Sequence, residues 1–124
     1  MNAPPSATYI ADVLLWFVEL PETPLRAGVH DQQCARRWQD RGIPLPLVES
    51  ALLLGSLRRL LRSADASPLS PIRSLAYFQP VLDALIAQPP PAGYLDYLRL
   101  KLRRLTAAKS GSARVQKNAF SHDR

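Results

Sequence analysis

His30 and Cys34 are the pair of side chains whose types and spacing come nearest to reactive or metal-binding chemistry. Four residues apart on a helix, they would share one face, as two zinc ligands or an imidazole beside a thiol would. A zinc site needs four ligands, and the sequence adds only one further histidine, His122, and no second cysteine. We therefore expect no metal site, and we expect Cys34 to pack as a small apolar residue.

Other patterns typical of catalytic or cofactor sites are missing from the sequence. Its five glycines are scattered, which excludes the glycine-rich loops of nucleotide-binding folds. No G-x-S-x-G nucleophile motif occurs, and the carboxylates are sparse and form no acid–base cluster. The sequence therefore predicts a non-enzymatic protein without a cofactor.

Positive charge is concentrated at the C-terminal end of the chain. Residues 1–98 hold eight arginines against nine acidic residues, a net charge of −1, whereas residues 99–124 hold eight basic residues against one aspartate, a net charge of +7. A polyanion such as DNA or RNA would meet this end first. The residues that we expect to contact phosphates are Arg99, Lys101, Arg103, Arg104, Lys109, Arg114 and Lys117. Tyr94 and Tyr97 precede them and have the rings to stack on unpaired bases, although packing on the protein is the simpler interpretation.

Helices must position these side chains, because apolar residues recur with helical spacing and no segment alternates with the period of a strand. The sequence predicts an all-α fold, a compact bundle of about five helices, with a disordered N-terminal segment (1–7), a helical domain (8–108) and a basic, disordered C-terminal tail (109–124). The predicted helices are 8–20, 30–41, 46–62, 71–87 and 93–108. Aromatic residues that fit core positions are Trp16, Phe17, Trp38, Tyr77 and Phe78.

A few residues mark the expected ends and contacts of these helices. Asp31 suits the start of the second helix, and Gly42 suits the left-handed residue just after its end. Gly55, inside the third helix, predicts the close approach of another helix. Ser70-Pro71 is typical of a helix start, and Pro80 should kink or split the helix that follows.

The last predicted helix leaves other functions open. Leu95, Leu98, Leu102 and Leu105 have the 3-4-3 spacing of a helix-pairing seam. Through this seam the protein could pair with a second copy or with a partner helix, as an adaptor or oligomerisation module. Peripheral attachment of the helix to an anionic membrane is a third possibility. A helix-turn-helix made of residues 30–41, Gly42 and residues 46–62 also stays open, although its second helix is very apolar for a recognition helix.

One arrangement of residues, within about 23–87, resembles a known family. The residues that carry it are Trp38-Gln-Asp-Arg-Gly42-Ile-Pro44-Leu45, then Val48 and Ala51, then Ser74-Leu75-Ala76-Tyr77-Phe78 with Val81 and Leu82. They are similar to the C-terminal helical domain of DnaD-type bacterial replication-initiation proteins, and to bacterial proteins with a W-x3-G-[I/V]-P-L-x2-V signature. The resemblance implies DNA-associated, non-enzymatic work in replication, with the basic segment after the bundle touching DNA.

The chain departs from the DnaD-type pattern in several places. Val81 stands where the family has an isoleucine, Leu85 or Ile86 replaces a tryptophan, and Pro80 interrupts the helix. The winged-helix domain of those proteins has no counterpart here. These departures put contacts to a replication machinery in doubt.

Neither a membrane span nor a secretory signal is expected. The longest apolar stretch, Tyr9 to Leu20, contains Asp12 and Glu19 and is far shorter than the ~20 residues that cross a bilayer. The first residues, MNAPPSA, lack the basic segment of a signal peptide. We therefore expect a cytoplasmic protein.

Overall fold

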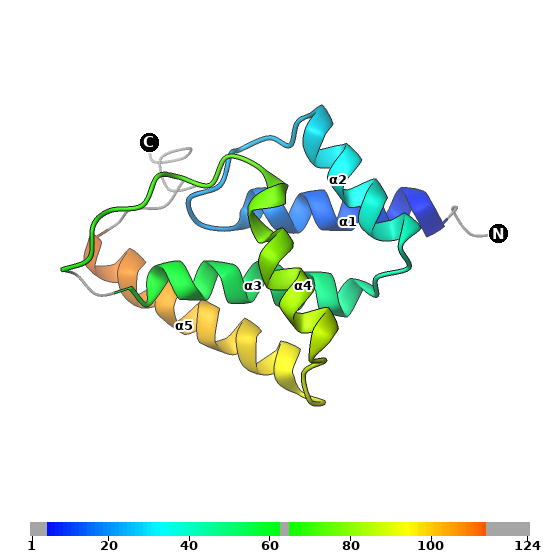
Figure 1. Cartoon of the computed structure of the whole chain (residues 1–124). Helices are drawn as coiled ribbons and strands as arrows, with labels where there is room; N and C mark the ends of the chain where they lie inside the picture. The colour runs from blue at the N-terminus through cyan, green and yellow to red at the C-terminus, as the bar shows by residue number, and fades with distance from the viewer. Residues whose placement is uncertain (1–4, 63–64, 114–124) are drawn as a thin grey trace.

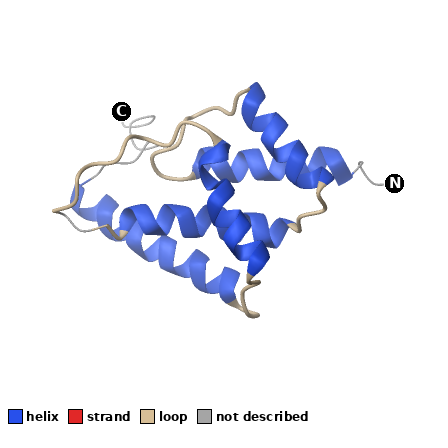
Figure 2. Cartoon of the chain, viewed as in Figure 1, coloured by secondary structure: helices blue, strands red, loops and turns tan. Residues whose placement is uncertain are grey.

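The computed structural model describes residues 5–62 and 65–113, with the helical backbone alone for 5–7 and 108–113. The elements of this part of the chain are α1 (Pro5–Glu19), α2 (Val29–Asp40), α3 (Leu45–Leu60), the short 3-10 helix η1 (Leu75–Phe78), α4 (Gln79–Ala87) and α5 (Tyr94–Ala113). No residue in these ranges belongs to a strand, as Figure 2 shows. The all-α prediction is confirmed.

Helix α3 lies at the centre and is contacted by α1, α4, η1 and α5 (Figure 1). Its apolar side chains are broadly distributed around the helix, so it buries residues such as Val48, Ala51 and Leu52 against several neighbours. Because α3 is enclosed in this way, it is not free to enter a DNA groove. The structure therefore removes the helix-turn-helix interpretation.

The close approach predicted at Gly55 is confirmed. A Cβ atom added to this glycine would lie 2.6 Å from a ring carbon of Phe78. Phe78 is the last residue of η1, and Pro80 follows in the first turn of α4, where a missing N–H removes no helical hydrogen bond. The predicted split at Pro80 thus separates η1 from α4 and lets the Phe78 ring lie on α3.

Asp31 joins two parts of the fold that are distant in sequence. Its Oδ2 atom accepts a hydrogen bond from the backbone N–H of Gly28 at 2.8 Å, which caps α2. Its Oδ1 atom accepts one from the N–H of Leu75 at 2.9 Å, at the start of η1. The carboxylate is buried, so these two backbone donors take the place of water.

Several predicted boundaries differ from the structure. No helix begins at Ser70-Pro71; the segment stays irregular as far as Ser74, because the Ile72 N–H bonds to the Glu22 carbonyl at 3.0 Å and draws the segment against the loop after α1. Helix α1 begins at Pro5, so residues 5–7, expected to be disordered, are helical, and α5 continues to Ala113. Residues 109–113, assigned by the sequence to a disordered tail, are therefore helical, whereas 1–4 and 114–124 lie outside the described residues.

Three of the five aromatic core predictions are confirmed, and Trp16 is partly buried against the core. Phe17, Trp38 and Phe78 are fully buried, and the Trp38 indole N–H donates to Gln79 Oε1 at 2.8 Å. Phe17 and Phe78 pack edge to face with ring centroids 6.3 Å apart. Tyr77 is instead 42% exposed, because it lies on the outward side of the short 3-10 turn.

Tyr9 supports a pH-dependent prediction. Its hydroxyl donates to the Ile43 carbonyl at 2.7 Å, and burial raises the pKa of Tyr9 to about 12. A raised pKa means that the folded protein holds this proton more tightly than the unfolded chain, so its contribution to stability is complete below pH ~10 and is lost as the pH rises towards ~12. Urea denaturation at several pH values should show a smaller loss above pH ~10 for Tyr9→Phe than for wild type. Parallel losses would contradict this role.

Candidate nucleic-acid interface

The basic residues predicted from the sequence lie on a helix that runs alongside α3. In Figure 1, α3 and α5 lie side by side and both end at the left of the view. Arg58 and Arg59 lie in the last turn of α3, and Arg62 follows the helix directly. The fold thus adds basic residues from α3 to the basic half of α5.

Arg99 is already engaged within the protein. Its Nη2 and Nε atoms donate to the two carboxylate oxygens of Glu49 on α3, at 2.7 and 2.9 Å, and Nη1 lies 3.4 Å from Asp96. These hydrogen bonds, led by those to Glu49, raise the pKa of Arg99. A two-pronged pair of this kind fixes α5 on α3 rather than leaving Arg99 free for phosphate.

Arg103 and Arg104 are exposed on α5 and, unlike the exposed but paired Arg99, form no ion pair within the described part of the chain. Lys101 is half-buried, as expected for a stem lying along the helix surface. The Lys109 side chain, Arg114 and Lys117 lie outside the described residues. Two of the seven predicted phosphate contacts are therefore both exposed and without an ion pair among the described residues.

Tyr94 and Tyr97 stack on each other with ring centroids 6.3 Å apart and 29° between their planes. Tyr94 packs against the core, whereas Tyr97 is 55% exposed. Helical geometry places Tyr97, Lys101 and Arg104 on one face, at positions i, i+4 and i+7. This face offers the Tyr97 ring and Arg104 to solvent, with the half-buried Lys101 between them.

The leucine seam of α5 is turned towards α3. Leu98 is 1% exposed, and Leu102 packs against the core. Leu95 and Leu105 are half-buried. Contacts within one chain therefore use much of the seam, while parts of Leu95 and Leu105 stay accessible. The adaptor interpretation keeps only this accessible part of the seam.

His30 and Cys34 do not form a site. Cys34 is buried in the core while His30 is exposed, so their side chains lie in different environments. Burial raises the pKa of the Cys34 thiol, which disfavours the reactive thiolate. Among the described residues no three histidine, cysteine, aspartate or glutamate side chains are grouped to hold a metal ion.

A hollow that the sequence did not predict lies at the end where α3 stops. Its volume is about 910 Å³, and we call it the arginine pocket. Its lining residues come from three segments: Glu22, Thr23 and Pro24; Arg59, Leu60 and Arg62; and Ala66–Leu69 with Pro71–Arg73. The sequence signal for this pocket was the group of arginines Arg58, Arg59 and Arg62. The same group is equally consistent with basic residues that offset the negative end of the helix dipole at the C-terminus of a helix.

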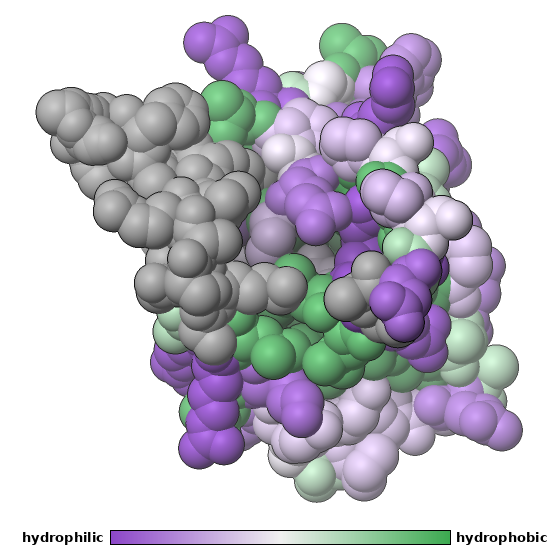
Figure 3. Space-filling model, turned by 90° about the vertical axis from the view of Figure 1, so that its left-hand side faces the viewer, coloured by the Kyte–Doolittle hydropathy of each residue, from purple (hydrophilic) through white to green (hydrophobic). Residues whose placement is uncertain are grey.

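Figure 3 looks onto this end, where green apolar surface borders purple polar residues around a hollow.

Comparisons with protein-family models, with curated proteins and with solved structures each found no match. No helix in the described ranges is long and apolar enough to cross a membrane. The case for a function therefore depends on the geometry.

Proposed function

We propose that this chain is a small, non-enzymatic nucleic-acid-binding accessory protein that contacts phosphates through α5 and the basic segment after it. The observation that carries the proposal is the pair of exposed arginines, Arg103 and Arg104, on a helix whose other side is fixed in the core. A rigid helix that presents cations to solvent attracts a polyanion without needing specific base contacts.

Charge balance along α5 supports this assignment. The acidic partners Glu49 and Asp96 pair with Arg99, near the start of the helix. From Leu100 to Lys117 the sequence contains no acidic residue. Positive charge therefore accumulates without compensation towards the end of α5, where α3 also contributes arginines.

The exposed Tyr97 ring on the same face as Lys101 and Arg104 supports binding of single strands, whose unpaired bases stack on aromatic side chains. The resemblance of residues 23–87 to DnaD-type domains supports a replication-associated role in the bacterial cytoplasm. Single-strand binding and a replication-associated role are both parts of the proposed function.

Reversing the two exposed charges tests the proposal. For Arg103→Glu combined with Arg104→Glu, we expect affinity for DNA to fall at least about tenfold, with the dependence of log affinity on log salt shallower by about two on duplex DNA. Fluorescence anisotropy with single- and double-stranded oligonucleotides measures both quantities. Charge reversal is cleaner than deleting α5, because Leu98 and Leu102 belong to the core.

The matched control is Arg36→Glu combined with Arg37→Glu, an exposed pair on α2 with the same change of charge. It should leave binding closer to wild type, because α2 lies away from the end where α3 and α5 stop (Figure 1). Equal losses of DNA affinity in the two variants would mean that the net charge of the protein, and not the position of Arg103 and Arg104, determines binding. Absence of binding by the wild-type protein at low salt would remove nucleic acid as the ligand.

A further inference from the structure

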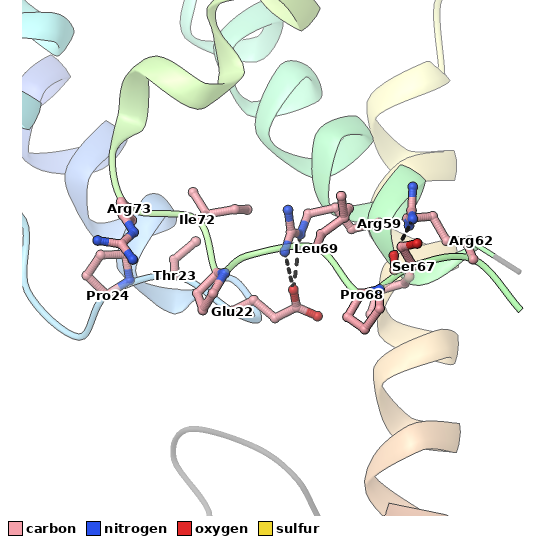
Figure 4. Close-up of a pocket in the computed structure, with 13 residues that line it drawn as sticks. Glu22, Thr23, Pro24, Arg59, Arg62, Ser67, Pro68, Leu69, Ile72 and Arg73 are labelled. Carbon is pink, nitrogen blue, oxygen red and sulfur yellow. Dashed lines mark hydrogen bonds and ion pairs between the residues drawn. The ribbon is translucent and has the colours of Figure 1, made fainter. Parts of the chain in front are cut away.

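The arginine pocket brings together charges from parts of the chain that are distant in sequence. Glu22 comes from the loop after α1, Arg59 from the last turn of α3, and Arg73 from the segment before η1 (Figure 4). Of the described residues, three arginines and one carboxylate line it, so the charge of this part of the lining is +2. A concave surface with a net positive lining is the arrangement expected for an anionic ligand.

Arg59 is fixed in place by its neighbours. Its side chain is only 6% exposed, and its Nε and Nη2 atoms both donate to Glu22 Oε1, at 3.1 and 2.6 Å. Nη2 also donates to the Ser70 carbonyl at 2.7 Å, and Nη1 lies 3.3 Å from the Tyr77 hydroxyl, with the guanidinium 5.5 Å from the Tyr77 ring centre. A guanidinium held in this way keeps one orientation, so an anion that displaced Glu22 would bind it with little further loss of side-chain entropy.

The Glu22 carboxylate is the anion that pairs with the Arg59 guanidinium in this structure. Its side chain is 48% exposed, and only one of its two oxygens binds Arg59. Its backbone has φ +65°, the left-handed region that glutamate rarely adopts, and the Ile72 N–H bonds to its carbonyl. Residues held in such conformations concentrate at ligand sites. Glu22 thus marks where an incoming anion would exchange onto Arg59.

Arg62 and Arg73 add charge at the edge of the pocket. Arg62 Nη2 donates to the Ser67 carbonyl at 2.6 Å, which leaves its positive charge unneutralised, and within the described ranges neither residue has an ion pair. Both are exposed, so both are accessible to a ligand. A phosphate monoester carries about −1.5 to −2 charge at pH 7 and offers three oxygens, which matches the +2 lining better than a single carboxylate does.

Most of the remaining lining is apolar: apart from Thr23 and Ser67, it consists of Leu60, Leu69, Ile72, Ala66 and three prolines. We propose that the arginine pocket binds a phosphate monoester, whose phosphate exchanges with Glu22 on Arg59, between Arg62 on one side and Arg73 on the other (Figure 4), while its organic group covers this apolar wall. This site is separate from Arg103 and Arg104, so it stands or falls independently of the nucleic-acid proposal.

Titration of the full chain with phenyl phosphate tests the site. We expect saturable changes in the NMR signals of the Arg59 Nε–H and the amides of 66–73 at constant ionic strength. Arg62→Glu combined with Arg73→Glu should weaken binding at least about tenfold, since each removes a charge-assisted contact. Glu22→Gln should strengthen it, because the competing anion is gone while the backbone is kept. Arg103→Glu combined with Arg104→Glu, the control, should leave these changes unaltered.

The phosphate monoester could be the 5′ end of a nucleic-acid strand or a free small molecule. Oligonucleotides with and without a 5′-phosphate distinguish these two ligands. Tighter binding of the phosphorylated strand, lost in the Arg62→Glu, Arg73→Glu variant, assigns the pocket to strand ends. Saturable phenyl phosphate binding with equal affinity for both strands assigns it to a free phosphate ester. Absence of saturation with phenyl phosphate, or the same changes with sodium chloride, would overturn the proposal. Weakened binding in the folded Glu22→Gln variant would overturn the exchange step.

Discussion

Leu98→Asp is expected to unfold the protein rather than to dissociate an assembly of chains. Leu98 is 1% exposed and lies on the side of α5 that packs on α3. Truncating a buried leucine alone costs about 2–5 kcal/mol, and a buried carboxylate without a partner costs more. We expect a loss of about 4 kcal/mol or more, a large part of the roughly 5–15 kcal/mol that holds a typical domain together. Urea denaturation followed by circular dichroism measures the loss.

Two substitutions on the same helix serve as controls. Leu100→Asp, at a position 42% exposed on the outward side, should change stability by only about 0.5 kcal/mol. Leu98→Met keeps the volume and should cost less than about 1.5 kcal/mol. A Leu98→Asp protein that stays folded while its mass in solution falls from dimer to monomer would show that the seam joins two chains, against the structure.

Asp31→Ala is expected to cost about 3 kcal/mol, because the carboxylate stabilises two places in the fold at once. Removing a helix cap costs about 1 kcal/mol. The N–H of Leu75, which is fully buried, would also lose its acceptor, and an unsatisfied buried donor costs about 1–3 kcal/mol. Thermal and urea denaturation give the change in the free energy of unfolding.

Asp31→Asn keeps one of the two acceptors, for either the Gly28 N–H or the Leu75 N–H. The other oxygen is replaced by an NH2 group, which cannot accept a hydrogen bond from the N–H that faces it. It should lie between wild type and Asp31→Ala. Asp40→Ala, at an exposed position in the last turn of α2, should change stability by no more than about 0.5 kcal/mol. An Asp31→Ala protein as stable as the Asp40→Ala protein would show that the bond to Leu75 contributes nothing.

Local sequence signals predicted the helices and several of their contacts. Gly42 takes the left-handed conformation expected after α2, with φ +73°. Gly55 faces the Phe78 ring, and Pro80 begins α4. Each of these depends on a conformational property of one residue type and on the few residues around it. The apolar period of the helices likewise depends on near neighbours, and so the all-α class could be inferred.

Contacts between distant segments could not be inferred in the same way. Ser70-Pro71 looked like a helix start, but the backbone bond from Ile72 to Glu22, fifty residues earlier, keeps that segment irregular. Among the predicted phosphate ligands, nothing near Arg99 in sequence identifies Glu49 as its partner. The arginine pocket combines three segments for the same reason.

By itself, then, the sequence determined the helical class, the turns set by glycine and proline, and the excess of positive charge after Leu98, because these depend on residue types and short-range spacing. Tertiary structure decided which charges are neutralised and which remain at the surface. It turned the leucine seam of α5 onto α3, paired Arg99 with Glu49, and left Arg103 and Arg104 exposed. The physical reason is that burial and ion pairing depend on which surfaces meet, and helices far apart in sequence meet only when the core forms.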